Sequence, residues 1–413
     1  MPVEGTLDKE KAMKTKIAIV GAGPAGLTLA HALLRRGIGD FLVFEKETDA
    51  GGLCRSRVVD GAPLDVGGGH FLDVRRPAVT DFLFSFMPEN EWNRFDRDSR
   101  IRIHGQTIGS PFEANIWQLD EAHRKRYLAD IAAAGCNTGA PMPEKFVDWI
   151  YWKLGKGIAE DYMLPYNRKM FGDDLNALGT YWLDKLPSVS YEDTLRSCEE
   201  RRPHAVQPGH AVFHYPKTAG IGEVWRRMAE ALGPRLVAGT EVRTLDVASR
   251  TLNGEIEADV VVNTAPWPAF ERIDGLSSEA HATIARLKHT SVDVDYVPKT
   301  LDTAAQWIYL PDPELPEHRL LVRSNFVPGA RGHWRETRRE RNVPLRPDAF
   351  RHSSEYSYPL NTIGKNEAMA ALLAETAANG VFGLGRWGEW QHYNTDVVVE
   401  RALALAERLT SVR

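Results

Sequence analysis

The stretch Lys16-Ile17-Ala18-Ile19-Val20-Gly21-Ala22-Gly23-Pro24-Ala25-Gly26 decides the fold. After Lys16, the apolar, β-rich run Ile17–Val20 predicts a buried strand, and Leu27–Arg36 predicts a helix. Between them, Gly21 permits a tight turn, Gly23 lets the backbone approach a pyrophosphate, and Gly26 lets helix and strand pack closely. The open N–H groups of the helix start favour phosphate. We therefore predict a dinucleotide-binding unit rather than a purely structural β-turn-α unit.

An acidic residue follows the next predicted strand. Phe41–Phe44 reads as that strand, and Glu45 comes 19 residues after Gly26, near the spacing of about 20 found in dinucleotide-binding units. Its carboxylate can accept hydrogen bonds from ribose hydroxyls. It would repel a 2′-phosphate, so NADP is disfavoured at this site.

Two further glycine clusters point to a longer cofactor than NAD. Gly51-Gly52-Leu53-Cys54-Arg55 is typical of FAD enzymes of the glutathione-reductase type. Gly67-Gly68-Gly69 precedes His70 and predicts backbone that passes close to a flat group such as the flavin ring. A β-bulge or a hairpin is the structural alternative for this third cluster.

Length and composition exclude several classes of protein. The 413 residues suit two or three domains, and 43% hydrophobic with 26% charged residues is ordinary globular composition. A net charge of −5 argues against nucleic acid and anionic membranes as partners. The three cysteines form neither a disulfide framework nor a zinc pattern, and the histidines lack ligand spacing, so we predict no metal. We expect a cytoplasmic protein without a spanning helix.

The order of predicted elements indicates an α/β fold. We predict an FAD-binding Rossmann-like domain of the glutathione-reductase type with an interleaved α+β substrate domain. The FAD-binding domain takes residues 16–75, 210–266 and 365–413, and the substrate domain takes 76–209 and 267–364, after a flexible tail at 1–15. The further predicted elements are helices at Glu121–Ala134, Pro143–Tyr151 and from Asp396 onward, and strands at Gly239–Leu245 and Ala258–Pro266, the latter as the last strand of the sheet.

Three later segments carry a resemblance to a known family. They are Pro111–Leu119, Tyr166–Gly172 and Gly385–Asp396. With them the chain, from about residue 16 to 410, resembles FAD-containing sugar mutases of the UDP-galactopyranose mutase type. That group lies within the amine-oxidase and protoporphyrinogen-oxidase superfamily.

The resemblance implies non-covalent FAD, with NAD(P)H as a candidate external reductant. In such mutases N5 of the reduced flavin attacks the anomeric carbon and expels the nucleotide diphosphate, and the resulting sugar–flavin adduct opens and recloses the sugar ring. The residues that we expect to bind the cofactor are Gly21, Gly23, Gly26, Glu45, Lys46, Gly51, Gly52, Leu53, Arg55, Gly68, Gly69, Val242, Gly385, Arg386 and Asp396.

The chain departs from the family pattern near the expected substrate. Asp73 stands where the mutases have a second histidine, and Phe171, Lys185 and Trp390 replace a Trp, an Arg and a Tyr. The resemblance implies His70, Asp73 and Arg168 as catalytic residues, and Tyr166, Phe171, Lys185, Tyr191, Arg319, Tyr356 and Trp390 as substrate-binding residues. Arg323 is a further candidate cation, and Trp182 and Tyr358 are further candidates for stacking. The alternatives are core packing for the aromatic residues, solvation for each arginine, and a purely structural role for His70.

Three functions follow from these features. The first is an FAD-dependent nucleotide-sugar mutase acting on a small-molecule nucleotide sugar, as a monomer or homodimer. The second is an FAD-dependent oxidoreductase of the amine-oxidase or protoporphyrinogen-oxidase type. The third is a non-catalytic flavoprotein that binds a nucleotide sugar or a partner.

Overall fold

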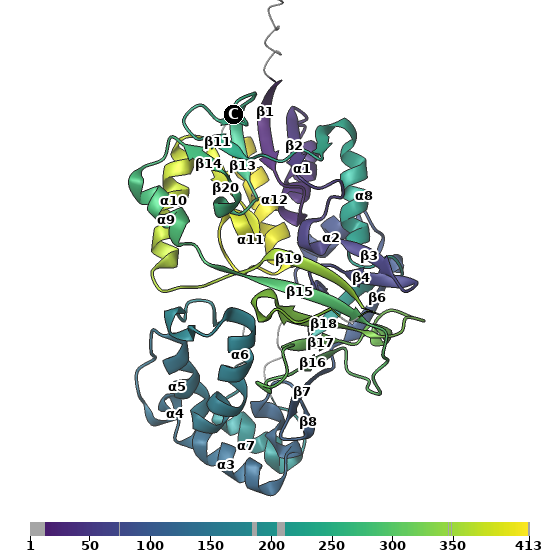
Figure 1. Cartoon of the computed structure of the whole chain (residues 1–413), viewed down its shortest axis with the longest axis vertical. Helices are drawn as coiled ribbons and strands as arrows, with labels where there is room; N and C mark the ends of the chain where they lie inside the picture. The colour runs from purple at the N-terminus through teal and green to yellow at the C-terminus, as the bar shows by residue number, and fades with distance from the viewer. Residues whose placement is uncertain are drawn as a thin grey trace, which may run out of the picture.

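The computed structural model describes residues 13–73, 75–183, 188–204, 211–345, 347 and 349–411 (Figure 1). Strand β1 (Met13–Val20) leads through the glycine turn into helix α1 (Pro24–Arg35), and β2 (Phe41–Glu45) pairs parallel to β1. A Cβ on Gly26 would overlap the carbonyl oxygen of Gly21. The predicted strand-turn-helix and the packing reason for Gly26 are therefore confirmed.

An eight-stranded sheet surrounds β1. Its path is β10 (Leu236–Ala238), β2, β1, β13 (Ile256–Asn263), β12 (Thr251–Leu252), β11 (Thr244–Asp246) and β14 (Arg272–Asp274), and β20 (Val381–Gly383) also pairs with β13. The strand predicted at Ala258–Pro266 ends at Asn263 and lies beside β1 rather than last. The strand predicted at Gly239–Leu245 is wrong over its first five residues, because the chain turns at Gly239 after β10.

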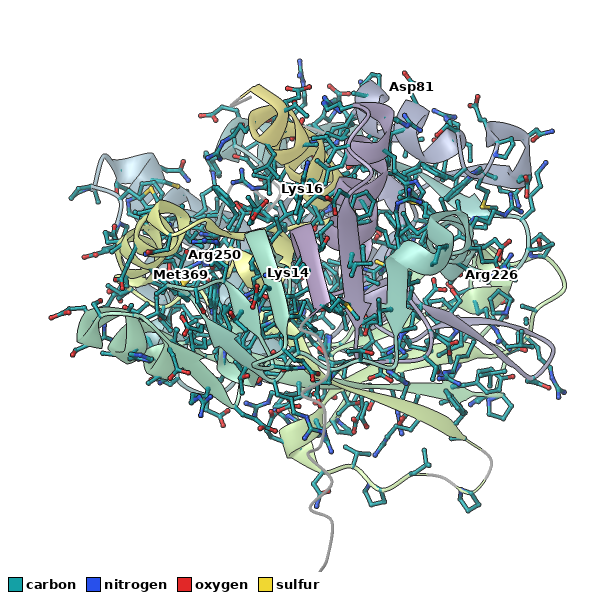
Figure 2. All side chains as sticks on the ribbon, turned by 90° about the horizontal axis from the view of Figure 1, so that it is seen from above. Lys14, Lys16, Asp81, Arg226, Arg250 and Met369 are labelled. Atoms are coloured by element: carbon teal, nitrogen blue, oxygen red, sulfur yellow. The ribbon has the colours of Figure 1, made fainter. Side chains whose placement is uncertain are left out.

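Helices cover this sheet. Helix α1 packs against α12 (Thr395–Ser411) and α8 (Gly222–Leu232), and α9 (Ser278–Arg286) packs against α10 (Lys365–Ala378). In the view from above, Arg226 of α8 and Met369 of α10 lie on opposite flanks of β1, which carries Lys14 and Lys16 (Figure 2). The helix predicted from Asp396 is confirmed as α12.

A seven-stranded sheet lies between this region and a group of helices (Figure 1). Its order is β19 (Phe350–Pro359), β15 (His289–Val297), β18 (His333–Arg338), β17 (Arg319–Leu321), β16 (Trp307–Tyr309), β7 (Ser99–Ile103) and β8 (Gln106–Gly109). All neighbours are antiparallel except β16 and β7. This sheet carries side chains from distant parts of the sequence to one surface.

The group of helices has its own hydrophobic core. It consists of α3 (Glu121–Ala132), α4 (Gly135–Thr138), α5 (Phe146–Ile158), α6 (Leu164–Phe171), α7 (Tyr191–Glu200) and the short 3-10 helix η3 (Glu113–Gln118). The two helices predicted here from the sequence are confirmed as α3 and α5, although α5 begins three residues later than predicted and continues to Ile158.

The remaining elements join these parts. They are α2 (Pro77–Phe84), the hairpin of β3 (Ser56–Val59) and β4 (Ala62–Asp65), and a small sheet of β5 (Leu72–Asp73), β9 (Val212–Pro216) and β6 (Trp92–Asp96). The predicted fold class is confirmed, since a Rossmann-like unit is interleaved with an α+β region. The domain boundaries stay a prediction, and β14 shows that the chain just beyond residue 266 still pairs in the first sheet.

Candidate functional site

Two cavities meet at three residues. The first, of about 520 Å³, lies along the turn after β1 and the end of β2. The second, of about 550 Å³, extends along the seven-stranded sheet into the group of helices. His70, Arg386 and Thr395 line both cavities. A long ligand in the first cavity can therefore present one end to the second.

Backbone forms the inner wall of the first cavity. Gly21 has φ 99°, and a Cβ there would overlap Thr264 Oγ1. A Cβ on Gly52 would lie 3.3 Å from Gly23 Cα, so the two predicted glycine loops face each other closely. Gly23 is the N-cap of α1 and has no side chain to cap the helix. The first N–H groups of the helix are therefore open to a ligand.

Glu45 combines a structural and a lining role. Its Oε2 accepts a hydrogen bond from the N–H of Ala22 at 2.8 Å, and its Oε1 accepts one from the N–H of Glu47 at 3.0 Å. The carboxylate thus fixes the glycine turn while Glu45 and Lys46 line the cavity. Its predicted contact with ribose hydroxyls stays a prediction.

The predicted cofactor residues line the first cavity, the second cavity or neither. Those that line the first cavity are Gly21, Gly23, Glu45, Lys46, Gly52, Leu53, Arg55, Val242 and Arg386. Gly26, Gly51, Gly68, Gly385 and Asp396 are not among the lining residues of either cavity, and Gly69 lines the second.

The predicted residues outside the lining shape the loops. The N–H of Gly51 bonds to the carbonyl of Ala22 at 2.8 Å. A Cβ on Gly385 would lie 2.8 Å from the Cβ of Ala25. Asp396 lies in the first turn of α12, is 2% exposed and pairs with Arg76 at 3.2 Å. These contacts give each residue a structural role within the protein, and a part in cofactor binding stays a prediction.

The triple-glycine run follows β4 as a turn that crowds protein side chains. A Cβ on Gly67 would lie 2.9 Å from His70 Nε2, and one on Gly69 would lie 2.6 Å from Leu321 Cδ2. Gly68 has φ 86°, and a Cβ there would overlap Glu336 Oε1. Contacts within the protein thus explain these glycines, whereas the predicted approach to a flat ligand rests on Gly67 and Gly69, which line the second cavity.

His70 stands at the junction as a neutral imidazole. Burial lowers its pKa to about 3, and the nearby cation of Arg386 acts in the same direction. An uncharged imidazole ring can stack on a flat ligand, and it can donate one hydrogen bond and accept another, without carrying a charge at neutral pH.

Arg386 supplies a fixed cation to the junction. It lies on the short helix α11 (Gly385–Gly388), and its Nε and Nη2 donate to the carbonyl of Tyr393 at 3.1 and 2.8 Å. Its Nη1 donates to the carbonyl of Ser357 at 3.0 Å. Lys365 fixes the same loop, because its Nζ donates to the carbonyl of Trp390 at 2.8 Å. The side chain at the junction is therefore anchored from several elements.

A buried ion pair lies beside the second cavity, which Arg319 lines. Arg319 donates from Nε and Nη2 to Glu336 Oε2 at 2.9 and 2.5 Å, and Glu336 is 1% exposed. Burial opposes the charge of Glu336, but Arg319 and His318 hold its pKa down at about 2. Nη1 of Arg319 makes no hydrogen bond to the part of the chain that the structure describes. Arg319, a predicted residue, is thus oriented with a donor to spare.

Arg97 is a second cation that sequence reasoning missed. Its Nη2 donates to the Tyr309 hydroxyl at 2.5 Å, its Nε donates to Ser99 Oγ at 2.6 Å, and its guanidinium lies 4.7 Å from the Trp307 ring. Arg97 and Arg319 both line the second cavity. No motif surrounds Arg97, which lies in the link between β6 and β7. The pairing of β6 with β9 and of β7 with β16 brings it to the site, and its N–H donates to the carbonyl of Ala211 at 2.9 Å.

Aromatic rings line the far part of the second cavity. Phe112 stacks on Tyr162 at 5.3 Å, Tyr162 lies 5.9 Å from Tyr166, and Tyr166 meets Tyr309 edge-on at 5.5 Å. The other predicted aromatic residues in this lining are Phe171, Trp182 and Tyr358. The wall suits a flat, partly apolar ligand group.

Three predicted site residues lie outside the two cavities. Arg168 is exposed on α6 and lines neither cavity, whereas the next residue, Lys169, is buried and donates from Nζ to the carbonyl of Leu310 at 2.7 Å. Asp73 is buried on β5 and pairs with Arg75 at 2.8 Å. Arg323 is fully buried and donates to backbone carbonyls. None of the three lines a cavity.

Four predicted substrate residues have other places. Trp390 is fully buried and packs edge-on against Trp387, and Tyr191 begins α7; both lie outside the lining of the cavities. Tyr356 lines the first cavity rather than the second. Lys185 lies outside the described residues.

The described part of the chain has neither a metal-binding cluster nor a helix that could span a membrane. No group of three or more His, Cys, Asp or Glu residues there is placed to hold a metal ion. Likewise, no helix within the described ranges is long and apolar enough to cross a membrane.

Known proteins resemble this chain in part and as a whole. Residues 19–86 match the NAD(P)-binding Rossmann-like domain family. A Baeyer-Villiger monooxygenase of Pseudomonas aeruginosa is 28% identical over 140 residues, which are 29% of this chain and 24% of that protein. A putrescine oxidase of Kocuria rosea is 41% identical over 68 residues, which are 16% of this chain and 14% of the oxidase. These matches span less than a quarter of each relative.

The structural match extends over the whole fold. The crystal structure of reduced UDP-galactopyranose mutase superposes with a TM-score of 0.86 at 24% identity, and the match covers 97% of this chain and 96% of the mutase. The predicted resemblance to this group of flavin-dependent enzymes is thus confirmed at the level of the fold. The chain has the fold of UDP-galactopyranose mutase, built on an NAD(P)-binding Rossmann-like unit.

Proposed function

We propose that the protein is an FAD-dependent nucleotide-sugar mutase that interconverts pyranose and furanose rings. The observation that carries the proposal is the junction of the two cavities at His70, Arg386 and Thr395. A dinucleotide in the first cavity would end next to a cavity that is lined by three arginines, Arg97, Arg319 and Arg386, and by aromatic rings.

The residues of the first cavity fit FAD. Close backbone at Gly21, Gly23 and Gly52 suits the pyrophosphate, and Glu45 at the end of β2 suits a ribose. When bound, the reduced flavin would supply a nucleophilic nitrogen to the anomeric carbon of the sugar. The protein would hold FAD without a covalent bond, and NAD(P)H is our candidate for the reductant.

The second cavity fits the three parts of a nucleotide sugar. The sugar would lie near the junction, beside the neutral ring of His70. Arg319 and Arg97 would hold the diphosphate and stabilise the charge that develops as its bond to the sugar breaks, since cations are most effective in a cavity from which water is excluded. The base would lie among the aromatic rings, with Tyr166 and Phe171 in contact.

Turnover in both redox states tests the proposal. The purified flavoprotein is reduced with dithionite without oxygen, given nucleotide sugars that differ in base and sugar, and analysed for pyranose and furanose forms by chromatography. We expect conversion of at least one nucleotide sugar by the reduced protein and none by the oxidised protein. Failure of every nucleotide sugar under reducing conditions would refute the proposal.

An FAD-dependent oxidoreductase of the amine-oxidase type is the second candidate. The match with putrescine oxidase at 41% identity over 68 residues favours it. It predicts oxygen consumption by the oxidised protein in the presence of an amine and no need for a reductant. The same preparation therefore distinguishes the two functions.

We also propose the partner, the cellular compartment and the oligomeric state of the protein. The partner is a small-molecule nucleotide sugar rather than nucleic acid or a membrane, the site is the cytoplasm, and the protein acts as a monomer or a homodimer. Gel filtration with light scattering and cell fractionation test these points.

A further inference from the structure

Glu113 is an acidic residue in the lining of the second cavity that the proposed function leaves without a role. It begins η3, next to Phe112, and only 9% of it is exposed. Burial raises the pKa of Tyr162, whose phenol ring also lines this cavity, and Tyr309 and the charge of Glu113 act in the same direction, so the Glu113 carboxyl group and the Tyr162 phenol lie near each other.

The carboxylate of Glu113 has acceptor capacity left for a ligand. Its hydrogen bond within the described chain is to its own backbone N–H, and burial raises its pKa. Lys153 acts on it electrostatically but donates from Nζ to the carbonyl of Val189 at 3.3 Å. No salt bridge joins Glu113 to a basic residue in the described ranges. A buried carboxylate in this state gains most from a ligand that brings its own donors.

Glu113 lies where a base would reach if the diphosphate of the same nucleotide lay on Arg97 and Arg319. The ring contacts from Phe112 through Tyr162 and Tyr166 lead to Tyr309, whose hydroxyl accepts the hydrogen bond of Arg97. With the diphosphate on Arg97 and Arg319, the base would reach the aromatic rings around Glu113.

A carboxylate discriminates between bases because it only accepts hydrogen bonds. Guanine presents two adjacent donors, N1–H and the 2-amino group, to two carboxylate oxygens. Uracil and thymine present a single N–H between two carbonyl oxygens, which the carboxylate would repel. A matched pair of charge-assisted hydrogen bonds is stronger than a neutral pair.

We infer that Glu113 makes this cavity selective for a guanine base, so that the substrate class is a guanosine-diphosphate sugar. The inference rests on the proposed function, because that function places a nucleotide in the cavity. It names the base and leaves the sugar to the junction at His70.

Calorimetric titration of the flavoprotein tests the inference. The probes are GDP, UDP and IDP, whose hypoxanthine base keeps N1–H but lacks the 2-amino group. We expect GDP to bind at least about 10-fold more tightly than UDP and about 10-fold more tightly than IDP, the discrimination of one good donor–acceptor pair. Glu113→Gln should remove most of this preference, and the control Glu144→Gln, at an exposed residue outside both cavities, should keep it.

Each other outcome overturns the inference in a recognisable way. Equal binding of UDP and GDP to the unaltered protein contradicts it, as does a Glu113→Gln variant that weakens both nucleotides equally. If Glu113→Gln does not fold with flavin, the unaltered protein still tests the inference: tighter binding of GDP than of IDP supports it, and equal binding contradicts it. If none of the nucleoside diphosphates binds, the proposed function itself fails.

Discussion

Gly68 is the position at which a single methyl group should disturb the centre of the site. Its φ of 86° is left-handed, which costs an alanine about 1–2 kcal/mol. A Cβ there would also overlap Glu336 Oε1 and lie 3.0 Å from its Cδ. Glu336 is 1% exposed and held by Arg319, so it cannot move aside without loosening a buried ion pair.

The size of the effect follows from these two costs. Loss of a buried pair costs about 3–5 kcal/mol when one charge is left uncompensated. We therefore expect Gly68→Ala to lower the free energy of unfolding by about 4–7 kcal/mol if the pair is lost, and by less in proportion as Glu336 keeps its place. Because Arg319 would turn with Glu336, affinity for a nucleoside diphosphate should also fall.

Gly61→Ala is the matched control. Gly61 has φ 72°, and a Cβ there would meet nothing within 4 Å. It should lose about 1–2 kcal/mol from backbone strain alone and keep its ligand affinity. Urea denaturation and calorimetry on both variants make the comparison. Equal stability and equal affinity for the two variants would refute the reasoning.

Three further predictions concern other charged residues. Arg319→Lys should weaken nucleoside diphosphate binding about 10- to 100-fold, from the loss of one charge-assisted hydrogen bond, while Arg168→Lys should leave the Kd measured by calorimetry unchanged. Burial raises the pKa of Asp65 from 3.8 to about 7, so the folded state holds a proton in this interval that the unfolded state has lost. The stabilisation by protonated Asp65 is therefore present below pH 4, and up to about 4 kcal/mol of it is lost as the pH rises through 7. Asp65→Asn should remove this pH dependence of the free energy of unfolding, measured by urea denaturation at several pH values. A variant with the same pH profile as the unaltered protein would contradict the prediction. Lys365→Met removes the donor to the Trp390 carbonyl and should lower the free energy of unfolding by about 1–3 kcal/mol. It should also speed the release of flavin, which fluorescence measures. An unchanged rate of release would show that this contact does not hold the loop beside the flavin.

Local sequence was sufficient for the parts of the fold that depend on local physics. The buried strand at Lys16–Val20, the glycine turn and the helix after it were predictable because their reasons lie within one short segment. The strand predicted at Gly239–Leu245 shows the limit. Its alternation is typical of a strand, yet the place beside β2 is taken by Leu236–Ala238, and only tertiary pairing decides this.

The candidate site was predictable only where a motif marked it. His70 follows the third glycine cluster, Arg386 lies in the segment Gly385–Asp396, and the family resemblance implied Arg319; all three line the cavities. Arg168 was one position away from the buried face of α6, because the motif does not fix which side of the helix faces inward. Glu113 lies in the recognised segment Pro111–Leu119, but nothing in that segment showed which of its side chains faces the cavity. Arg97 lies outside every motif and reaches the cavity through strand pairing between distant segments, which one sequence does not reveal.

Titration of the oxidised protein with nucleoside diphosphates, followed by flavin absorbance, tests the central claim most directly. The claim is that FAD lies in the first cavity and meets the ligand of the second at His70, Arg386 and Thr395. We predict that the protein purifies with FAD and that a saturable change in the flavin spectrum accompanies binding. A protein that binds no flavin, or a nucleotide that binds by calorimetry without changing the flavin spectrum, would contradict the claim.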